Sequence, residues 1–190
     1  MSYERHNIKS VSKDLQKFVI NTPVLRFDII DSLCNCNVFF KCENFQHTGS
    51  FKYRAAINAI KNMPIEFKQT GVITHSSGNF AYALARASYE LKIPCHIVMP
   101  NNTPNFKKSS VLSYTKNVIE CESNLKAREF TTSEILKNKN LYFIHPSNNM
   151  DVILGNSSCA LEFVNDYPNL DFIFSPIGGG GAIAGTSIAI

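Results

Sequence analysis

The sequence predicts an α/β fold organised around a parallel sheet. From residue 71 onward, short apolar runs alternate with longer segments that have one apolar face. Proline and glycine residues mark several of the junctions between them. Alternation of this kind is typical of a parallel, doubly wound architecture, because each crossover helix returns the chain to the same end of the sheet.

The first third of the chain is less regular. Residues 12–20 predict a short amphipathic helix, and residues 28–33 predict another. An apolar run within residues 36–42 predicts a buried strand. Residues 55–60 predict a third helix, which follows a Thr-Gly-Ser turn at residues 48–50.

The remaining elements follow in regular order. We expect strands at residues 71–74, 95–99, 118–120, 141–144 and 172–174. We expect helices at residues 80–91, 105–114, 125–136, 152–164 and 182–190. No internal repeat or low-complexity segment interrupts this pattern.

Composition is that of an ordinary globular protein. The 190 residues are 44% apolar and 18% charged, enough for one domain or two small ones. The net charge of +4 comes without a dense basic run, so we expect no nucleic-acid partner. No apolar stretch reaches the ~18 residues that a membrane helix needs, so we expect no membrane partner.

Cysteine and histidine usage indicates neither disulfides nor a metal site. The six cysteines are scattered, and the histidines at positions 75, 96 and 145 lack the spacing of metal ligands. Residues 1–10 are polar and contain no signal-peptide core. We therefore expect reduced thiols and a cytoplasmic location.

Lys52 is the first candidate catalytic residue. We expect Ser50 to be the N-cap of the following helix, which places Lys52 in the first helical turn. The helix dipole disfavours a cation there, so this amine should lose its proton more readily than that of a free lysine. A neutral amine is what Schiff-base chemistry requires. The alternative interpretation is a solvated surface lysine.

A second candidate segment joins a predicted strand to a predicted helix. It consists of Ser76, Ser77, Gly78 and Asn79. Hydroxyls, an amide and free backbone N–H groups converge here at a helix N-terminus, an arrangement that suits an anion. An ordinary helix cap is the alternative interpretation.

The third candidate segment is the run Gly178, Gly179, Gly180 and Gly181. Consecutive glycines let backbone N–H groups curl into an anion-binding nest, and the helix that follows adds favourable potential. A flexible linker is the alternative, but linkers rarely lie between an apolar strand and an apolar helix. The spacing is not that of the dinucleotide-binding fingerprint.

Residues 46–55, Gln-His-Thr-Gly-Ser-Phe-Lys-Tyr-Arg-Ala, closely resemble the lysine motif of a known family. This family comprises the serine/threonine dehydratases and serine racemases, which are fold-type-II, tryptophan-synthase-β-like enzymes that use pyridoxal 5′-phosphate (PLP). The resemblance extends from about Thr22 to the last residue. It implies that Lys52 holds PLP as a Schiff base, that Phe51 packs beside the cofactor, and that the four glycines bind its phosphate.

The resemblance also implies roles for substrate-binding residues. The segment from Ser76 to Asn79 would grip the substrate carboxylate, and Asn79 would also contact the cofactor ring oxygen. Ser77 matches the position that racemases use as an acid and base on the face opposite the lysine. Arg128 is similar to a racemase arginine that helps to hold the carboxylate, with a solvent-facing helix arginine as the alternative.

The implied function is deamination of L-serine or L-threonine to a 2-oxo acid and ammonia, serine racemisation, or both. The implied fold is a three-layer structure in two lobes. Residues 1–70 and 149–190 would form the large PLP-binding domain, and residues 71–148 the small α/β domain. Mg²⁺ and ATP are implied as effectors, and a homodimer is among the implied states.

Other features depart from the family pattern. Members are considerably longer, so the sequence predicts an incomplete cofactor lobe that lacks the acidic metal cluster of racemases. Phe80 and Ser147 stand where many members have His and Asn, and residues 155–158 read Gly-Asn-Ser-Ser where Gly-Gln-Gly-Thr is usual. The alternative function is therefore a truncated, non-catalytic homologue that binds PLP weakly or pairs with a full-length relative.

Overall fold

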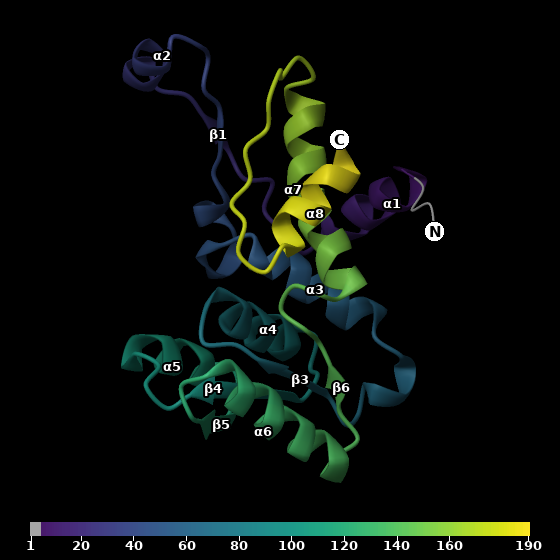
Figure 1. The fold of residues 1–190 in the computed structure, drawn as a ribbon. Helices are drawn as coiled ribbons and strands as arrows, with labels where there is room; N and C mark the ends of the chain where they lie inside the picture. The colour runs from purple at the N-terminus through teal and green to yellow at the C-terminus, as the bar shows by residue number, and fades with distance from the viewer. Residues whose placement is uncertain (1–4) are drawn as a thin grey trace.

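A four-stranded parallel sheet forms the centre of one end of the molecule (Figure 1). The computed structural model describes residues 5–190, so the first four residues of the polar N-terminal stretch lie outside it. The strand order is β5-β4-β3-β6. The strands are β3 (Val72–His75), β4 (Cys95–Pro100), β5 (Asn117–Cys121) and β6 (Tyr142–Phe143). The predicted parallel α/β architecture is confirmed.

Helices occupy most of the connections between strands. They are α1 (Arg5–Leu15), α2 (Asp28–Cys34), α3 (Lys52–Asn62), α4 (Asn79–Glu90), α5 (Asn105–Leu112), α6 (Leu125–Asn138), α7 (Met150–Asp166) and α8 (Gly181–Ala189). A separate antiparallel pair joins β1 (Val24–Leu25) to β2 (Phe40–Lys41). All helices expected after residue 71 are present, with small shifts at their ends.

Alternation along the strands gives the sheet two apolar faces. On one face, Val72 belongs to the same buried cluster as Leu84 of α4. On the other face, Ile73 belongs to a cluster against which Ile135 of α6 packs. The sheet therefore lies between α4 and α6, as Figure 1 shows, in a three-layer arrangement.

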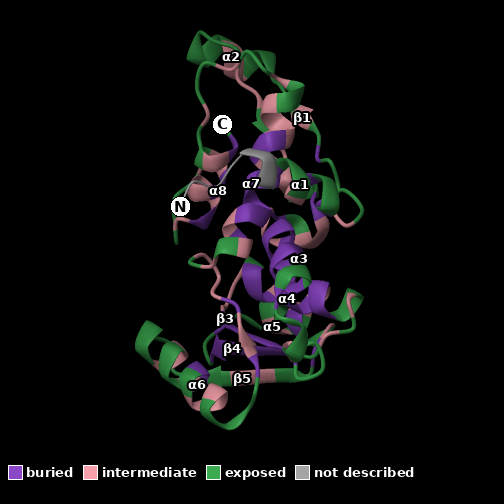
Figure 2. Cartoon of the chain, turned by 90° about the vertical axis from the view of Figure 1, so that its right-hand side faces the viewer, coloured by how far each residue is buried: buried purple, intermediate pink, exposed green. Residues whose placement is uncertain are grey.

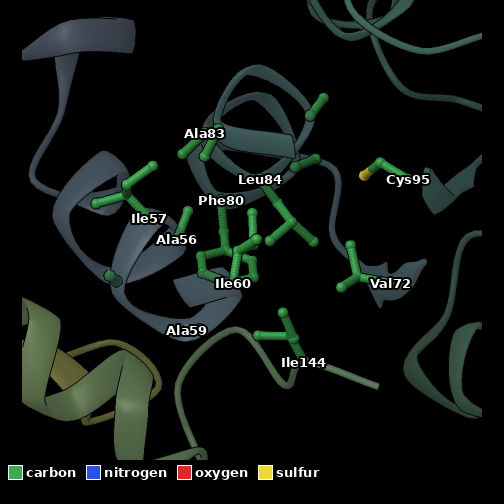
Figure 3. Close-up of a cluster of buried hydrophobic side chains, with 14 of the residues drawn as sticks. Ala56, Ile57, Ala59, Ile60, Val72, Phe80, Ala83, Leu84, Cys95 and Ile144 are labelled. Carbon is green, nitrogen blue, oxygen red and sulfur yellow. The ribbon is translucent and has the colours of Figure 1, made fainter. Parts of the chain in front are cut away.

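The largest buried cluster lies where α3 meets α4 and the sheet (Figure 3). Ile57 and Ile60 of α3 pack there near Phe80 and Leu84 of α4. Figure 2 shows the same region as largely buried, whereas α2 is exposed. This cluster holds the two helices that carry the predicted lysine and carboxylate sites. The division into lobes at residues 70/71 and 148/149 stays a prediction.

Helix α7 is packed between α3 and α8. A side chain at Gly185 of α8 would place its Cβ 2.6 Å from the carbonyl oxygen of Ile153, so only glycine permits this close approach. Every helix in the part of the chain that the structure describes is too short or too polar to cross a bilayer.

The first helix begins and ends earlier than the sequence predicts. The prediction placed it at residues 12–20, but α1 spans Arg5–Leu15. Ile8 and Leu15 are buried, and Ile8 shares a cluster with Leu154 of α7. The apolar stripe that packs on α7 therefore begins before residue 12, and this packing sets the position of the helix.

The predicted strand at residues 172–174 is wrong. This segment is irregular, and Phe172 and Phe174 are 80% and 93% exposed. Within residues 5–190, no strand lies beside it to share backbone hydrogen bonds. Instead, residues 169–176 border a cavity of about 990 Å³, whose other walls are residues 36–41, Glu43, Phe51 and residues of α7 and α8.

Candidate active site

The loop that leads into α3 is fixed by the buried side chain of Gln46. Its Oε1 accepts hydrogen bonds from the backbone N–H groups of Ile20 and His47, at 3.1 and 3.0 Å. Its Nε2 donates to the carbonyl oxygen of Ile20 at 2.8 Å. Thr48 and Gly49 then adopt left-handed backbone angles, with φ of 64° and 68°, and turn the chain into the helix. Such angles are costly for threonine, so the surrounding contacts must hold this turn.

A buried charge network ties the start of α3 to α7. Arg54 is fully buried and donates to the carboxylate of Glu43 at 2.8 and 2.9 Å and to that of Glu162 at 2.7 Å. It also donates to the carbonyl oxygen of Ile20 at 3.0 Å. Lys41 forms an ion pair with Glu162 at 2.9 Å. Two cations face two carboxylates here, so no buried charge is left uncompensated.

Helix α3 begins at Lys52, which confirms the predicted first-turn position. The predicted cap is wrong: Phe51 occupies the N-cap position, and the buried Oγ of Ser50 has no hydrogen-bond partner. Lys52 is half-buried because aromatic rings and a loop surround it. Its Nζ donates to the carbonyl oxygen of Pro146 at 3.4 Å and lies 4.8 Å from the ring centroid of Phe51 and 6.0 Å from that of Phe80.

Burial lowers the pKa of Lys52 below its ordinary value. The direction agrees with the sequence prediction, and the physical cause is desolvation of the ammonium group. The amine is therefore more readily deprotonated, which makes it a better nucleophile and base near neutral pH.

The turn at residues 76–79 connects the end of β3 to the start of α4. The backbone N–H of Ser76 donates to the carbonyl oxygen of Val98 at 3.0 Å, which fixes the turn to β4. Gly78 holds the N-cap position, and no side chain caps the helix. The N–H groups of Asn79 and Phe80 therefore have no intrahelical acceptor and can bind an anion. Phe80 also approaches Lys52, so this turn and the lysine share one region.

The glycine run leads directly into α8. Gly180 has φ of 83°, a left-handed angle that favours glycine, and it occupies the N-cap position. A Cβ on Gly179 would lie 2.4 Å from Ser147 Oγ, and a Cβ on Gly181 would lie 3.0 Å from the Ser147 carbonyl oxygen. A Cβ on Gly178 would meet nothing within 4 Å. The backbone therefore passes close to Ser147 before it exposes the N–H groups of the first turn of α8.

The loop at residues 145–149 brings the lysine and the glycines into one site. Its Pro146 carbonyl oxygen faces Lys52, while its Ser147 lies against Gly179. The loop then enters α7, where the Asn149 side chain accepts a hydrogen bond from the N–H of Val152 at 3.1 Å. One loop therefore contacts both predicted cofactor-binding segments, although these are far apart in the sequence.

His145 sets the shape of this loop. Its Nδ1 accepts hydrogen bonds from the backbone N–H groups of Ser147 and Asn148, at 3.1 and 2.8 Å. A nitrogen that accepts cannot carry a proton, so the ring is neutral with its proton on Nε2. The ring also packs edge-on against His75, with centroids 5.6 Å apart. Burial lowers the pKa of His145, which favours this neutral form.

Arg128 is not brought into contact with Lys52 or with the glycines. It lies on α6, near the end of β3, and its positive charge adds to burial and to the effect of His145 in lowering the pKa of His75. Within residues 5–190 its guanidinium forms no ion pair. Its role in binding a carboxylate stays a prediction.

Sequence reasoning found three of the segments that converge here but missed the loop that joins them. The polar run from Ser147 to Asn149 begins four residues after the end of β6 at Phe143. Polar residues just after a strand of a parallel sheet lie at the edge where ligands bind, and this was the available signal. Asn156 of α7 was also missed as a site residue. Asn156 is 3% exposed, yet neither amide atom has a hydrogen-bond partner in the part of the chain that the structure describes.

Comparison with known proteins identifies the protein family of this chain. The model of a family described as "Pyridoxal-phosphate dependent enzyme" matches residues 15–190, which is most of the chain. The chain belongs to this family. The resemblance inferred from residues 46–55 is therefore confirmed, and so is the fold class that it implied.

Several characterised relatives are similar over nearly the whole chain. Serine racemase from Dictyostelium discoideum is 40% identical over 182 residues, which cover 96% of this chain and 56% of the relative. A beta-hydroxyaspartate dehydratase from Paracoccus denitrificans is 39% identical, over 93% of this chain and 56% of the relative. Maize serine racemase, whose structure is solved, is 35% identical in sequence to this chain. The two structures align with a TM-score of 0.95, over 100% of this chain and 57% of the maize chain. This chain thus spans little more than half the length of these relatives.

Proposed function

We propose that this chain takes part in PLP-dependent chemistry on a small amino acid. The reaction is deamination of L-serine or L-threonine to a 2-oxo acid and ammonia, serine racemisation, or both. Similar relatives carry the names serine racemase and beta-hydroxyaspartate dehydratase, which supports both outcomes at the level of the family.

The residues present fit the cofactor. An aldehyde needs a neutral amine, and burial lowers the pKa of Lys52. A phosphate needs convergent N–H donors, and the glycine run ends at the uncapped N-terminus of α8. Lys52 would hold PLP, Phe51 and Asn79 would contact its ring, and Gly178–Gly181 would bind its phosphate.

The cofactor supplies an electron sink that stabilises negative charge on the substrate α-carbon. The N–H groups at the start of α4, with Ser76 and Gly78, would bind and orient the substrate carboxylate. Arg128 would add a positive charge near that group. Lys52, in its neutral form, would remove the α-proton from one face. Ser77 would return a proton to the opposite face in racemisation.

The observation that carries this proposal is the position of the loop at residues 145–149. Pro146 of this loop faces Lys52 Nζ at 3.4 Å, and Ser147 of the same loop packs against the glycine run. A single bound molecule could therefore contact the amine at one end and the anion-binding N–H groups at the other. No isolated surface lysine would have such surroundings.

The first test is titration of the purified chain with PLP, followed by near-visible absorbance, beside Lys52→Ala. We expect a band of lysine-bound cofactor in the parent that is absent from the variant and shifts when L-serine is added. Pyruvate and D-serine assays would then separate deamination from racemisation. A folded parent that shows no band at saturating PLP would contradict the proposal.

We propose a second candidate because of the cavity beside residues 169–176. In this candidate the chain is a non-catalytic homologue that binds PLP weakly or pairs with a full-length relative. The cavity of about 990 Å³ and the exposed Phe172 and Phe174 favour it, since a strand from a partner could cover them. It predicts no turnover and co-sedimentation with a full-length family member. The effects of Mg²⁺ and ATP, and a homodimer, remain predictions.

A further inference from the structure

The buried amide of Asn156 is the most unusual polar group near the site. Among the described residues 5–190, neither its oxygen nor its nitrogen has a hydrogen-bond partner, although the residue is only 3% exposed. Burying an amide without partners destabilises a fold, because the hydrogen bonds to water are lost and not replaced. Most buried polar groups in native proteins are satisfied, so this exception calls for a reason.

The direction of this side chain follows from its contacts with α8. The Cβ of Asn156 lies 3.0 Å from the position that a Cβ on Gly185 would take, in the second turn of α8. Its Nδ2 lies 3.4 Å from the corresponding position on Gly181, the first residue of the helix. The side chain therefore runs back along α8, and its amide points to the uncapped N-terminus of that helix.

The backbone N–H groups at the N-terminus of α8 also lack acceptors within the helix. The N-cap residue Gly180 has no side chain to accept a hydrogen bond, and the N–H of Ala184 donates to the Gly180 carbonyl oxygen at 3.0 Å. The N–H groups of the residues between them have no intrahelical acceptor. An amide donor and several backbone donors thus lack acceptors at one place, which has a partial positive charge.

A ligand could reach this place from the lysine. The cavity described above is lined by Asn156, Ala182 and Phe51, among other residues. Phe51 is the neighbour of Lys52, whose Nζ lies 4.8 Å from its ring centroid. The residue that carries the unpaired amide therefore lines the same cavity as the neighbour of the reactive lysine.

We infer that Asn156 is an additional phosphate-binding residue, whose side-chain N–H donates to the phosphate monoester held at the N-terminus of α8. The inference rests on the proposed function, because the phosphate is that of PLP. According to this inference, the unsatisfied amide of Asn156 destabilises the ligand-free chain. Its hydrogen bond to the phosphate stabilises the PLP-bound chain. A purely structural asparagine would not combine these two effects.

The test compares PLP with pyridoxal, which has the same aldehyde but no phosphate. Asn156→Leu should weaken PLP binding, measured by absorbance titration, by about tenfold to a hundredfold, as expected for loss of one hydrogen bond to a charged group. It should leave pyridoxal binding unchanged. It should also raise the Tm of the ligand-free chain, because an apolar side chain of similar shape removes two unsatisfied atoms.

Asn58 offers a matched control on the neighbouring helix. It is also an asparagine with 3% exposure, but its Nδ2 donates to the carbonyl oxygen of Asp151 at 2.7 Å. Asn58→Leu should therefore lower the Tm and leave the ratio of PLP to pyridoxal affinity unchanged. Should Asn156→Leu not fold, Asn156→Asp preserves the shape and brings a negative charge beside the phosphate, so it should weaken PLP binding even more.

The inference is overturned if Asn156→Leu, or Asn156→Asp in its place, binds PLP as tightly as the parent. If the parent binds neither PLP nor pyridoxal at Lys52, the proposed function fails, and inorganic phosphate becomes the deciding probe. A phosphate-dependent rise in Tm that the parent shows and the Asn156 variant lacks would still support the assignment. An equal response in both would refute it.

Discussion

At the scale of single residues, His145 links acidity to the shape of the site. Its Nδ1 accepts two backbone N–H groups of the loop that faces Lys52, so protonation of this nitrogen would break both hydrogen bonds. Burial lowers its pKa, and the carboxylate of Glu129 on α6 acts in the opposite direction. His75 and Arg128 are the other charged or titratable groups at this corner.

We predict that this histidine makes the chain sensitive to acid. A histidine that is held neutral takes up its proton more readily in the unfolded chain, so stability should fall as pH drops below about 6.5. His145→Asn should reduce this loss, since its Oδ1 can accept the same N–H groups without titrating. The measurement is the free energy of unfolding between pH 5 and pH 8, a range set by the ordinary histidine pKa of about 6.5.

Two outcomes would separate this role from mere packing. His145→Leu, which has no acceptor, should be less stable than the parent by about 1–3 kcal/mol at neutral pH. Any loss of stability at low pH that remains in His145→Asn would come from other groups such as His75, whose pKa is also lowered by burial. If the parent and His145→Asn show identical pH profiles, the loop does not depend on the protonation state of His145.

At the scale of elements, the site depends on how one helix begins. Gly180 adopts φ of 83° at the N-cap position of α8, a left-handed angle that favours glycine. The residues on either side of it, Gly179 and Gly181, pass close to Ser147, so the chain cannot easily relax to another path. The glycine run is thus ordered by its neighbours rather than flexible.

Gly180→Ala should therefore be destabilising. A Cβ at this backbone angle costs about 1–2 kcal/mol. The free energy of unfolding from denaturant titration measures the effect, and Gly178→Ala is the control. A Cβ on Gly178 would meet nothing within 4 Å and its φ is not positive, so that variant should have the stability of the parent. Equal stability of both variants would show that the left-handed angle is not required.

The sequence was sufficient to predict helices and strands whose packing partners are close to them in the chain. The strands and helices from Val72 to Phe143 were predictable, because each apolar run has a paired neighbour and each helix covers a face. Lys52 and the glycines could be recognised from local motifs. For the loop at Pro146 and Ser147 the polar residues after β6 were the sole local signal, since its role comes from contacts with segments distant in sequence. Phe172–Phe174 has strand-like composition, but a strand also needs a neighbour.

At the scale of the whole molecule, the two ends differ in how completely they are packed. The parallel sheet is covered by α4 and α6 (Figure 1), whereas the cavity beside α7 and α8 has mainly apolar walls. Phe172 and Phe174 are exposed at its border. Exposed apolar groups that adjoin a hollow promote association with other polypeptides.

The double variant Phe172→Ser, Phe174→Ser should reduce self-association without unfolding the chain. These side chains are 80% and 93% exposed, so their removal gives up little buried area. Light scattering against concentration measures association, and denaturant titration measures stability. A decrease of more than about 2 kcal/mol in the free energy of unfolding would contradict this prediction, because it would mean that the two rings are packed against the rest of the chain.

The arrangement around α7 also has a consequence for the order of events during synthesis. Lys52 precedes α7 and the glycine run in the chain, so the ribosome synthesises it before them. An aldehyde cofactor that meets the nascent chain can encounter the amine before the glycine run exists. If the glycine run binds the phosphate, as proposed, firm retention of the cofactor must await synthesis of α7 and α8.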